Sequence, residues 1–156
     1  MDRQRPSSHE AGHTLVGLFL GFQIEGIEAF EGRLRTMCHL DAEDRTHQER
    51  FIFLAGGIAG EKSVLGNYDP GGCKDDQQKI TERGGKSIET YLPEATKIIE
   101  SNHECFLELK RKITIRVIEE SMGAAISGGK NSFKLLTGDT VRQIWQAFSN
   151  SKRPKP

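Results

Sequence analysis

Cysteine is scarce in this sequence, with three in 156 residues. Cys38, Cys73 and Cys105 are widely spaced and odd in number, so they fit neither a disulfide framework nor a C-x-x-C zinc knuckle. A chain with this cysteine usage is typical of a reducing compartment, and we therefore predict a cytoplasmic location.

Long hydrophobic runs are also missing. The longest apolar stretch, residues 15–22, contains two glycines and is far shorter than the roughly 20 residues that a membrane-spanning helix needs. We therefore expect no transmembrane segment.

Neither sign of charge is in excess, since 22 basic residues balance 22 acidic ones. This balance argues against a general attraction to nucleic acid or to an anionic membrane, and we predict no nucleic-acid partner. Only the tail, residues 151–156, is locally basic. With 35% hydrophobic and 28% charged residues, the composition is typical of a water-soluble, largely helical protein.

One motif indicates a chemistry. His9 and His13 are the histidines of an H-E-x-x-H run, and Glu10 is its glutamate. On a helix, side chains four residues apart lie on the same face, so both imidazoles can bind one zinc ion. The carboxylate of Glu10 then lies where it can take a proton from a zinc-bound water, as in zinc peptidases. Because the motif begins at residue 9, we expect no signal peptide before it.

A helix around this motif is expected from the neighbouring residues. Ser7 and Ser8 are candidate N-caps, Pro6 is typical of a first helical turn, and Gly21 is a candidate stop. We therefore predict a helix of about 14 residues, within the usual 8–20.

The remaining sequence predicts an α+β protein that is mostly α-helical, with a small antiparallel β-sheet. We assign residues 1–122 to a metallopeptidase-like core and residues 123–156 to a loop, a closing helix and a basic tail packed on the same domain. Apolar spacing and turn residues indicate the following elements: strands at 22–30 and 33–40, a buried helix from Thr46 to near Gly66, a helical segment at 74–80, one long helix from Pro93 to about Glu120, a loop at 123–131 and a helix after Thr137.

A third metal ligand has to come from outside the motif. The metzincin pattern is excluded, because Val16 stands where its glycine is required and Phe19 where its third histidine is required. Asp75 is the best placed carboxylate, since it is near the start of a separate helix after a glycine-rich turn. Three glutamates are also conceivable as the ligand: Glu28, Glu31 and Glu43.

Four segments, taken in order, resemble the peptidase domain of the FtsH-type AAA zinc metalloproteases. The likeness covers about residues 7–80 and resumes weakly at 135–142. The segment that begins with the H-E-x-x-H run is similar to the H-E-A-G-H motif of that family, and the others are similar to its L-P-E-E-D-R, L-L-G-G-R-A-A-E-E and G-A-x-N-D-L-Q-Q motifs. The four segments are residues 9–16, 36–45, 53–62 and 71–78.

The resemblance implies a zinc-dependent peptidase that hydrolyses peptide bonds in small or unfolded polypeptides. It implies Glu10 as the general base and His9, His13 and Asp75 as the zinc ligands. Substrate is expected to add as a strand to the sheet edge within residues 22–40. Family members form hexameric rings, and either a dimer or a hexamer is compatible with this chain.

Family members also carry a membrane anchor and an ATPase motor, for which these residues offer no counterpart. Gly85-Lys86-Ser87 does not form a P-loop, because Ile80 stands where its first glycine is required, so no ATPase activity is expected. The missing motor leaves an alternative function open. In it the chain is a weak or inactive peptidase fold that acts as an interaction or regulatory module.

The other candidate metal-binding side chains are expected to have packing or surface roles. Cys73 lies two residues before Asp75, but a lone cysteine is usually a small, partly buried residue. The same expectation holds for the three remaining histidines, His39, His47 and His103.

Overall fold

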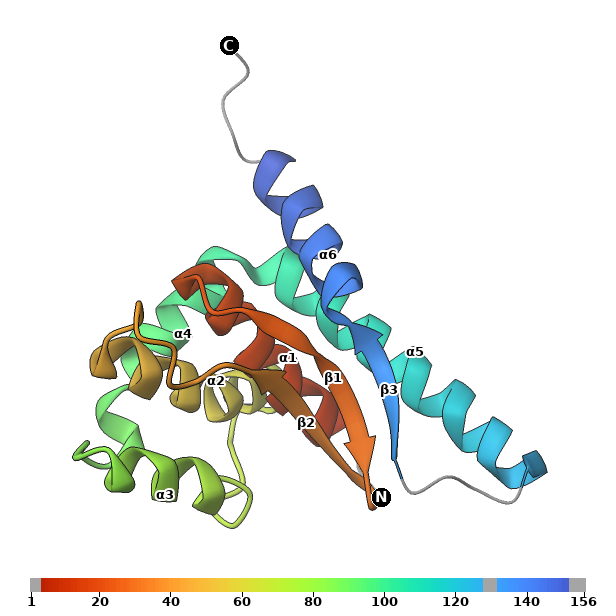
Figure 1. The fold of residues 1–156 in the computed structure, drawn as a ribbon, viewed down its shortest axis with the longest axis horizontal. Coiled ribbons are helices and arrows are strands. Elements are labelled where there is room, and N and C mark those ends of the chain that lie inside the picture. The colour runs from red at the N-terminus through yellow and green to blue at the C-terminus, as the bar shows by residue number, and fades with distance from the viewer. Residues whose placement is uncertain (1–3, 128–131, 152–156) are drawn as a thin grey trace.

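The computed structural model describes the backbone of residues 4–127 and 132–151, in a mostly helical fold with one three-stranded antiparallel sheet (Figure 1). This confirms the predicted fold class. The elements are α1 (Gln4–Leu20), β1 (Ile24–Phe30), β2 (Arg33–Cys38), α2 (His47–Leu65), α3 (Lys74–Glu82), the 3-10 turn η1 (Ile88–Thr90), α4 (Leu92–Ser101), α5 (His103–Ser127), β3 (Ser132–Thr137) and α6 (Gly138–Ser151).

The order of strands in the described sheet is β2-β1-β3. β2 and β3 are therefore its two edge strands. β1 and β2 form the predicted hairpin. β3 was not predicted, because it pairs with β1 from more than 100 residues away and no local turn signals it. In Figure 1 the sheet crosses α1, and α3 lies on the opposite side of the molecule from α5.

α2 confirms the prediction of a buried helix, since every residue from Arg50 to Glu61 is buried. It begins with a capping box, in which the Glu49 amide donates to Thr46 Oγ1 and the Thr46 amide donates to Glu49 Oε1. It ends at Gly66, whose φ of 78° suits a residue without a side chain. The predicted start and stop are therefore both correct.

Two other helix predictions need correction. α1 is already helical at Gln4, so Ser7 and Ser8 are buried inside the helix and do not cap it. The long helix predicted from Pro93 is two helices that meet at Asn102. The side-chain amide of Asn102 donates to the Ile98 carbonyl and occupies an acceptor at the end of α4, which favours a break there.

The C-terminal part also differs from the prediction. α5 continues to Ser127, so residues 123–127 are helical and not loop, while 128–131 lie outside the described residues. The division after residue 122 therefore falls within a helix. The closing helix is present as α6, which packs on α5 and β1, and residues 152–156 of the basic tail are likewise outside the described part.

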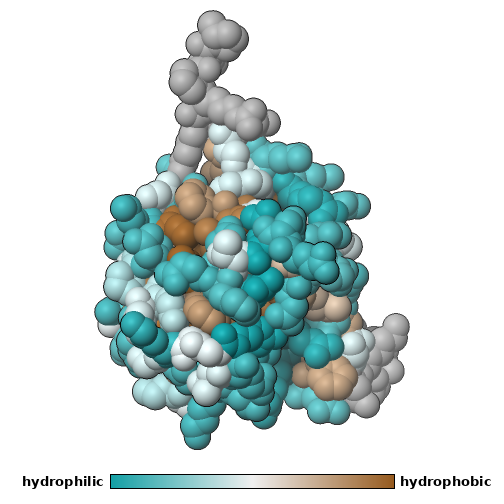
Figure 2. Space-filling model, turned by 60° about the vertical axis from the view of Figure 1, so that its left-hand side comes forward, coloured by the Kyte–Doolittle hydropathy of each residue, from teal (hydrophilic) through white to brown (hydrophobic). Residues whose placement is uncertain are grey.

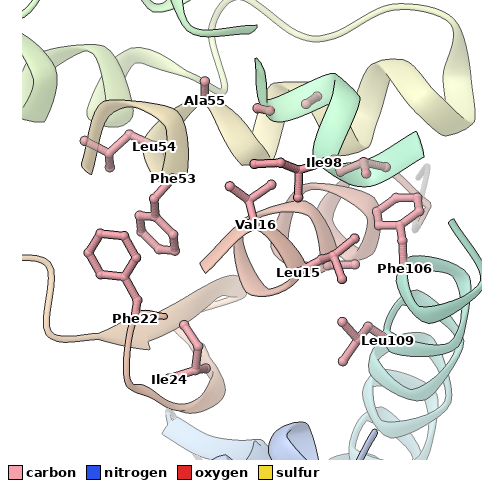
Figure 3. Packing of buried hydrophobic residues seen from close by; sticks show 14 of the residues in the cluster. Leu15, Val16, Phe22, Ile24, Phe53, Leu54, Ala55, Ile98, Phe106 and Leu109 are labelled. Carbon is pink, nitrogen blue, oxygen red and sulfur yellow. The ribbon is translucent and has the colours of Figure 1, made fainter. Parts of the chain in front are cut away.

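The hydrophobic core lies between α1, α2, α5 and the sheet. Figure 3 shows Leu15 and Val16 of α1 between Phe53 of α2 and Phe106 of α5. The surface in Figure 2 is mainly hydrophilic, with apolar side chains gathered in a smaller area of that face. Among the described helices, none has both the length and the apolar character needed to cross a bilayer.

Backbone contact between α1 and α2 sets the position of the site. A Cβ built on Gly12 of α1 would lie 2.0 Å from the Gly56 carbonyl oxygen, and one built on Gly60 would lie 2.2 Å from the Ser8 carbonyl oxygen. Only residues without side chains allow this approach. Gly12, Gly56 and Gly60 therefore allow the two helices to pack with their backbones in contact.

We expect Gly12→Ala to lower the free energy of unfolding by about 2 kcal/mol, because the added methyl group forces the two helices apart. Urea denaturation monitored by circular dichroism measures this change. Gly72→Ala is the matched control, since a Cβ there meets its nearest atom at an ordinary 3.5 Å and should alter stability by less than about 0.5 kcal/mol. Equal stability of the two variants would contradict the account of the helix contact.

Candidate metal centre

α1 brings the two motif histidines together, as their spacing predicts. His9 and His13 lie one turn apart, and their Nε2 atoms are 3.0 Å from each other. His13 is buried and His9 is nearly so. Two neutral imidazole nitrogens on one helix face are a ligand pair that suits zinc.

The third member of the cluster is Asp76, at the start of α3. Its Oδ2 lies 3.2 Å from Nε2 of His9 and 3.2 Å from Nε2 of His13. These three side chains are the group that can hold a metal ion among the described residues. Asp75, the ligand predicted from the sequence, is exposed and does not belong to this group. The prediction was therefore displaced by one residue.

A signal in the sequence could have distinguished the two aspartates. Ile80 is the single large apolar residue of α3, and its side chain is fully buried. Asp76 precedes Ile80 by four residues and so shares its inward face, whereas Asp75 points about 100° away around the helix. The helical register of α3, and not the order of letters in the motif, identifies the aspartate that lies with the histidines.

The separations in the cluster fit a zinc ion. Tetrahedral ligands at about 2.0–2.1 Å from zinc lie about 3.3–3.4 Å from one another, and the three ligand atoms here are separated by 3.0–3.2 Å. Space for them depends on Gly57 of α2. A Cβ at that position would lie 2.4 Å from His9 Nε2 and 2.6 Å from His13 Nε2. A side chain there would fill the place where the ligand atoms converge.

Neighbouring groups orient both imidazoles. Nδ1 of His13 lies 3.0 Å from the Phe53 carbonyl oxygen, and Nδ1 of His9 lies 3.5 Å from Oε2 of the buried Glu61. A proton held on Nδ1 leaves the lone pair on Nε2, which is the atom that points into the cluster. Arg5 in turn contacts Glu61 at 3.4 Å and lies next to this buried charge.

Burial and neighbouring charges act in opposite directions on the pKa values of His9 and Asp76. Burial lowers the pKa of His9, but the nearby carboxylates of Asp76 and Glu61 and the charge of Glu10 outweigh it and raise the pKa to about 10. Burial raises the pKa of Asp76, yet the two histidines hold it well below its usual range. A metal ion binds only the neutral imidazole, so an ion at Nε2 of His9 competes with a proton for that ring.

We expect Glu61→Gln to weaken zinc binding by about 10–100-fold, because the partner that orients His9 loses its charge. Competition with a zinc-sensitive dye measures the dissociation constant. Glu43→Gln alters an exposed glutamate in the loop after β2 and should leave zinc affinity unchanged. An unchanged affinity in Glu61→Gln would show that the 3.5 Å contact does not support His9.

Glu10, the predicted general base, is buried next to the cluster on α1. Its Oε2 accepts a hydrogen bond of 2.7 Å from the Thr36 hydroxyl of β2. Thr36 is a residue of the site that the sequence reasoning missed. It stands on a strand whose alternation was recognised, but its partner on α1 is 26 residues away.

The cluster opens into a cleft of about 810 Å³. Its lining includes residues 33–36 of β2, residues 74–76 of α3, and the two histidines and Glu10 of α1. Arg83, the residue that follows α3, pairs with Asp41 through two hydrogen bonds of 2.8 Å, so the end of the helix that carries Asp76 is linked to the turn after β2.

Comparison with models of protein families finds no match to this chain, and comparison with curated proteins finds none either. The resemblance noted in the sequence therefore rests on its four motifs. The functional argument has to come from the geometry of the cluster and the cleft.

The remaining candidate ligands lie outside the cluster. Cys73 is buried, and its Sγ donates to the Pro70 carbonyl at 3.3 Å. His39 pairs with Glu25 at 2.6 Å, and His47 contacts Arg50 at 3.2 Å. These contacts agree with the packing and surface roles expected of them. The three glutamates considered as ligands are also outside the group of three: Glu28, Glu31 and Glu43.

Proposed function

We propose that this protein is a zinc-dependent metallopeptidase that hydrolyses peptide bonds in small or unfolded polypeptides, with a peptidase domain of the FtsH type. The observation that carries the proposal is the convergence of His9, His13 and Asp76 within 3.2 Å of one another, beside Glu10 and at the floor of an open cleft. Two imidazoles, one carboxylate and a neighbouring glutamate are the set that zinc peptidases use.

Each residue of the set has a distinct task. His9, His13 and Asp76 would hold the zinc ion, which when bound would activate a water molecule and polarise a carbonyl group. Glu10 takes the proton of the attacking water and delivers it to the leaving amine. One oxygen of its carboxylate is held by Thr36, so the other is available for proton transfer.

The position of β2 at the edge of the sheet favours the proposal that the substrate is a polypeptide. β2 is one of the two outer strands of the described sheet, and its residues line the cleft. An extended peptide can pair with such an edge through its main chain, which gives affinity with little dependence on sequence. Unfolded and short polypeptides have main-chain groups free for such pairing, and this supports the proposed substrate class.

The test is to measure bound zinc and the cleavage of a fluorescein-labelled unfolded protein. We expect one zinc ion per chain, cleavage that stops with 1,10-phenanthroline, and recovery when zinc is restored. Zinc at full occupancy without chelator-sensitive cleavage would overturn the peptidase proposal and favour the alternative, an interaction module. A chain that binds no zinc would overturn both the metal site and the reaction.

A further inference from the structure

We propose that Thr36 is a positioning residue for Glu10, and that it ties the orientation of the general base to the strand on which substrate docks. This inference rests on the proposed peptidase function and deepens it. Thr36 lies in β2 and lines the cleft, and it contacts Glu10 of α1 directly.

Three oxygen contacts define the arrangement. Thr36 Oγ1 lies 2.7 Å from Glu10 Oε2, 3.3 Å from the Glu10 carbonyl oxygen and 3.2 Å from Thr14 Oγ1. A hydroxyl has one proton to donate, and the shortest contact, to a carboxylate, takes it. The Thr14 hydroxyl then donates to Thr36, which gives a chain from Thr14 through Thr36 to Glu10.

The periodicities of α1 and β2 explain why Thr14, Thr36 and Glu10 lie next to one another. Thr14 follows Glu10 by four residues, so the two side chains lie on the same face of α1. Thr36 and Leu34 alternate with the exposed Arg33 and Arg35 along β2, so Thr36 is on the face of the strand turned towards α1. Thr14 is fully buried, which makes it a fixed end for the chain of hydroxyls.

A carboxylate with one oxygen fixed has one defined orientation for the other. Glu10 is buried, and the hydrogen bond that its carboxylate receives among the described residues comes from Thr36, so Thr36 is the donor that fixes its rotation. Because Thr36 belongs to the edge strand, a peptide that pairs with β2 engages the same strand that holds the base. Substrate docking and orientation of the base therefore depend on one element.

Thr36→Val and Thr36→Ser test the proposal. Valine keeps the shape but loses the hydroxyl, and serine keeps the hydroxyl. We expect Thr36→Val to bind zinc as wild type does, to retain KM within about twofold and to lower kcat by about 10–100-fold, while Thr36→Ser retains kcat within about threefold. In a Glu10→Gln background, Thr36→Val should have no further effect, because Thr36 acts through the carboxylate.

Either of two kinetic results would overturn the inference: a normal kcat in Thr36→Val, or an equal loss in Thr36→Ser, which would assign the effect to packing. Crystal structures of the zinc-loaded proteins give a readout independent of activity. We expect a single Glu10 rotamer in wild type and more than one in Thr36→Val. If wild type fails to cleave, the peptidase proposal falls, while an unchanged Glu10 rotamer in the variant refutes the role of Thr36 by itself.

Discussion

Asp76→Ala is expected to weaken zinc binding by more than about 100-fold, whereas Asp75→Ala should bind zinc as tightly as wild type. Loss of a direct ligand should exceed the 10–100-fold effect that is typical of an outer partner. The expectation follows from Oδ2 of Asp76, which lies 3.2 Å from both Nε2 atoms, while Asp75 is exposed on the outer side of α3. Competition titrations with a zinc-sensitive dye measure both constants.

The two variants are matched controls for each other. Each removes one carboxylate from the first turn of the same helix, so a general effect of negative charge near the site would appear in both. Circular dichroism spectra that match wild type would show that the fold is retained. Tight binding in Asp76→Ala, or loss in Asp75→Ala, would show that the register of α3 in solution differs from that described.

Glu10→Gln is expected to lower kcat by about 10²–10⁴-fold and to leave the zinc content at one ion per chain. Glutamine can still accept the hydrogen bond from Thr36, but it cannot accept the proton of the attacking water. The ligand atoms belong to other residues, so the affinity for zinc should change little. Steady-state cleavage of a quenched fluorescent peptide gives kcat, and metal analysis gives the occupancy.

Glu43→Gln is the control for this substitution, because it makes the same chemical change at an exposed position. It should cleave at the rate of wild type. Comparable kcat values in Glu10→Gln and wild type would mean that another group transfers the proton, and the assignment of Glu10 as general base would then be wrong.

The helices that build the site were largely predictable from local patterns. The spacing of His9 and His13 defines one face of α1, and the capping residue Thr46 and the stop at Gly66 define α2. These features depend on residues within one or two helical turns of each other. For that reason the sequence alone predicts them well.

Features that depend on distant partners were predicted less well. β3 forms because β1 offers it an edge, and its own residues carry no hairpin turn. The break at Asn102 occurs between a helix that packs on α2 and one that packs on α1. A pattern of apolar residues along the chain does not show which neighbour each helix will meet.

The third ligand illustrates the same limit on a smaller scale. Asp75 and Asp76 are chemically identical, and the glycine-rich turn before them suits both equally well. Which aspartate lies with the histidines depends on which side of α3 faces the core. The buried side chain of Ile80 marks that side. Alignment to a motif compares letters by their order alone and ignores the turn of about 100° between successive helical residues. Helical periodicity takes this turn into account.

The glycine contact between α1 and α2 has a consequence for how this protein can change. Because the two backbones touch at Gly12, Gly56 and Gly60, their spacing is set by main-chain atoms and not by the volume of core side chains. Substitutions at Leu15 or Phe106 can then repack the interior while the two histidines of α1 keep their position against Gly57 of α2. The arrangement of α1 and α2 at the site therefore tolerates substitutions in the core, and the surrounding sequence can diverge.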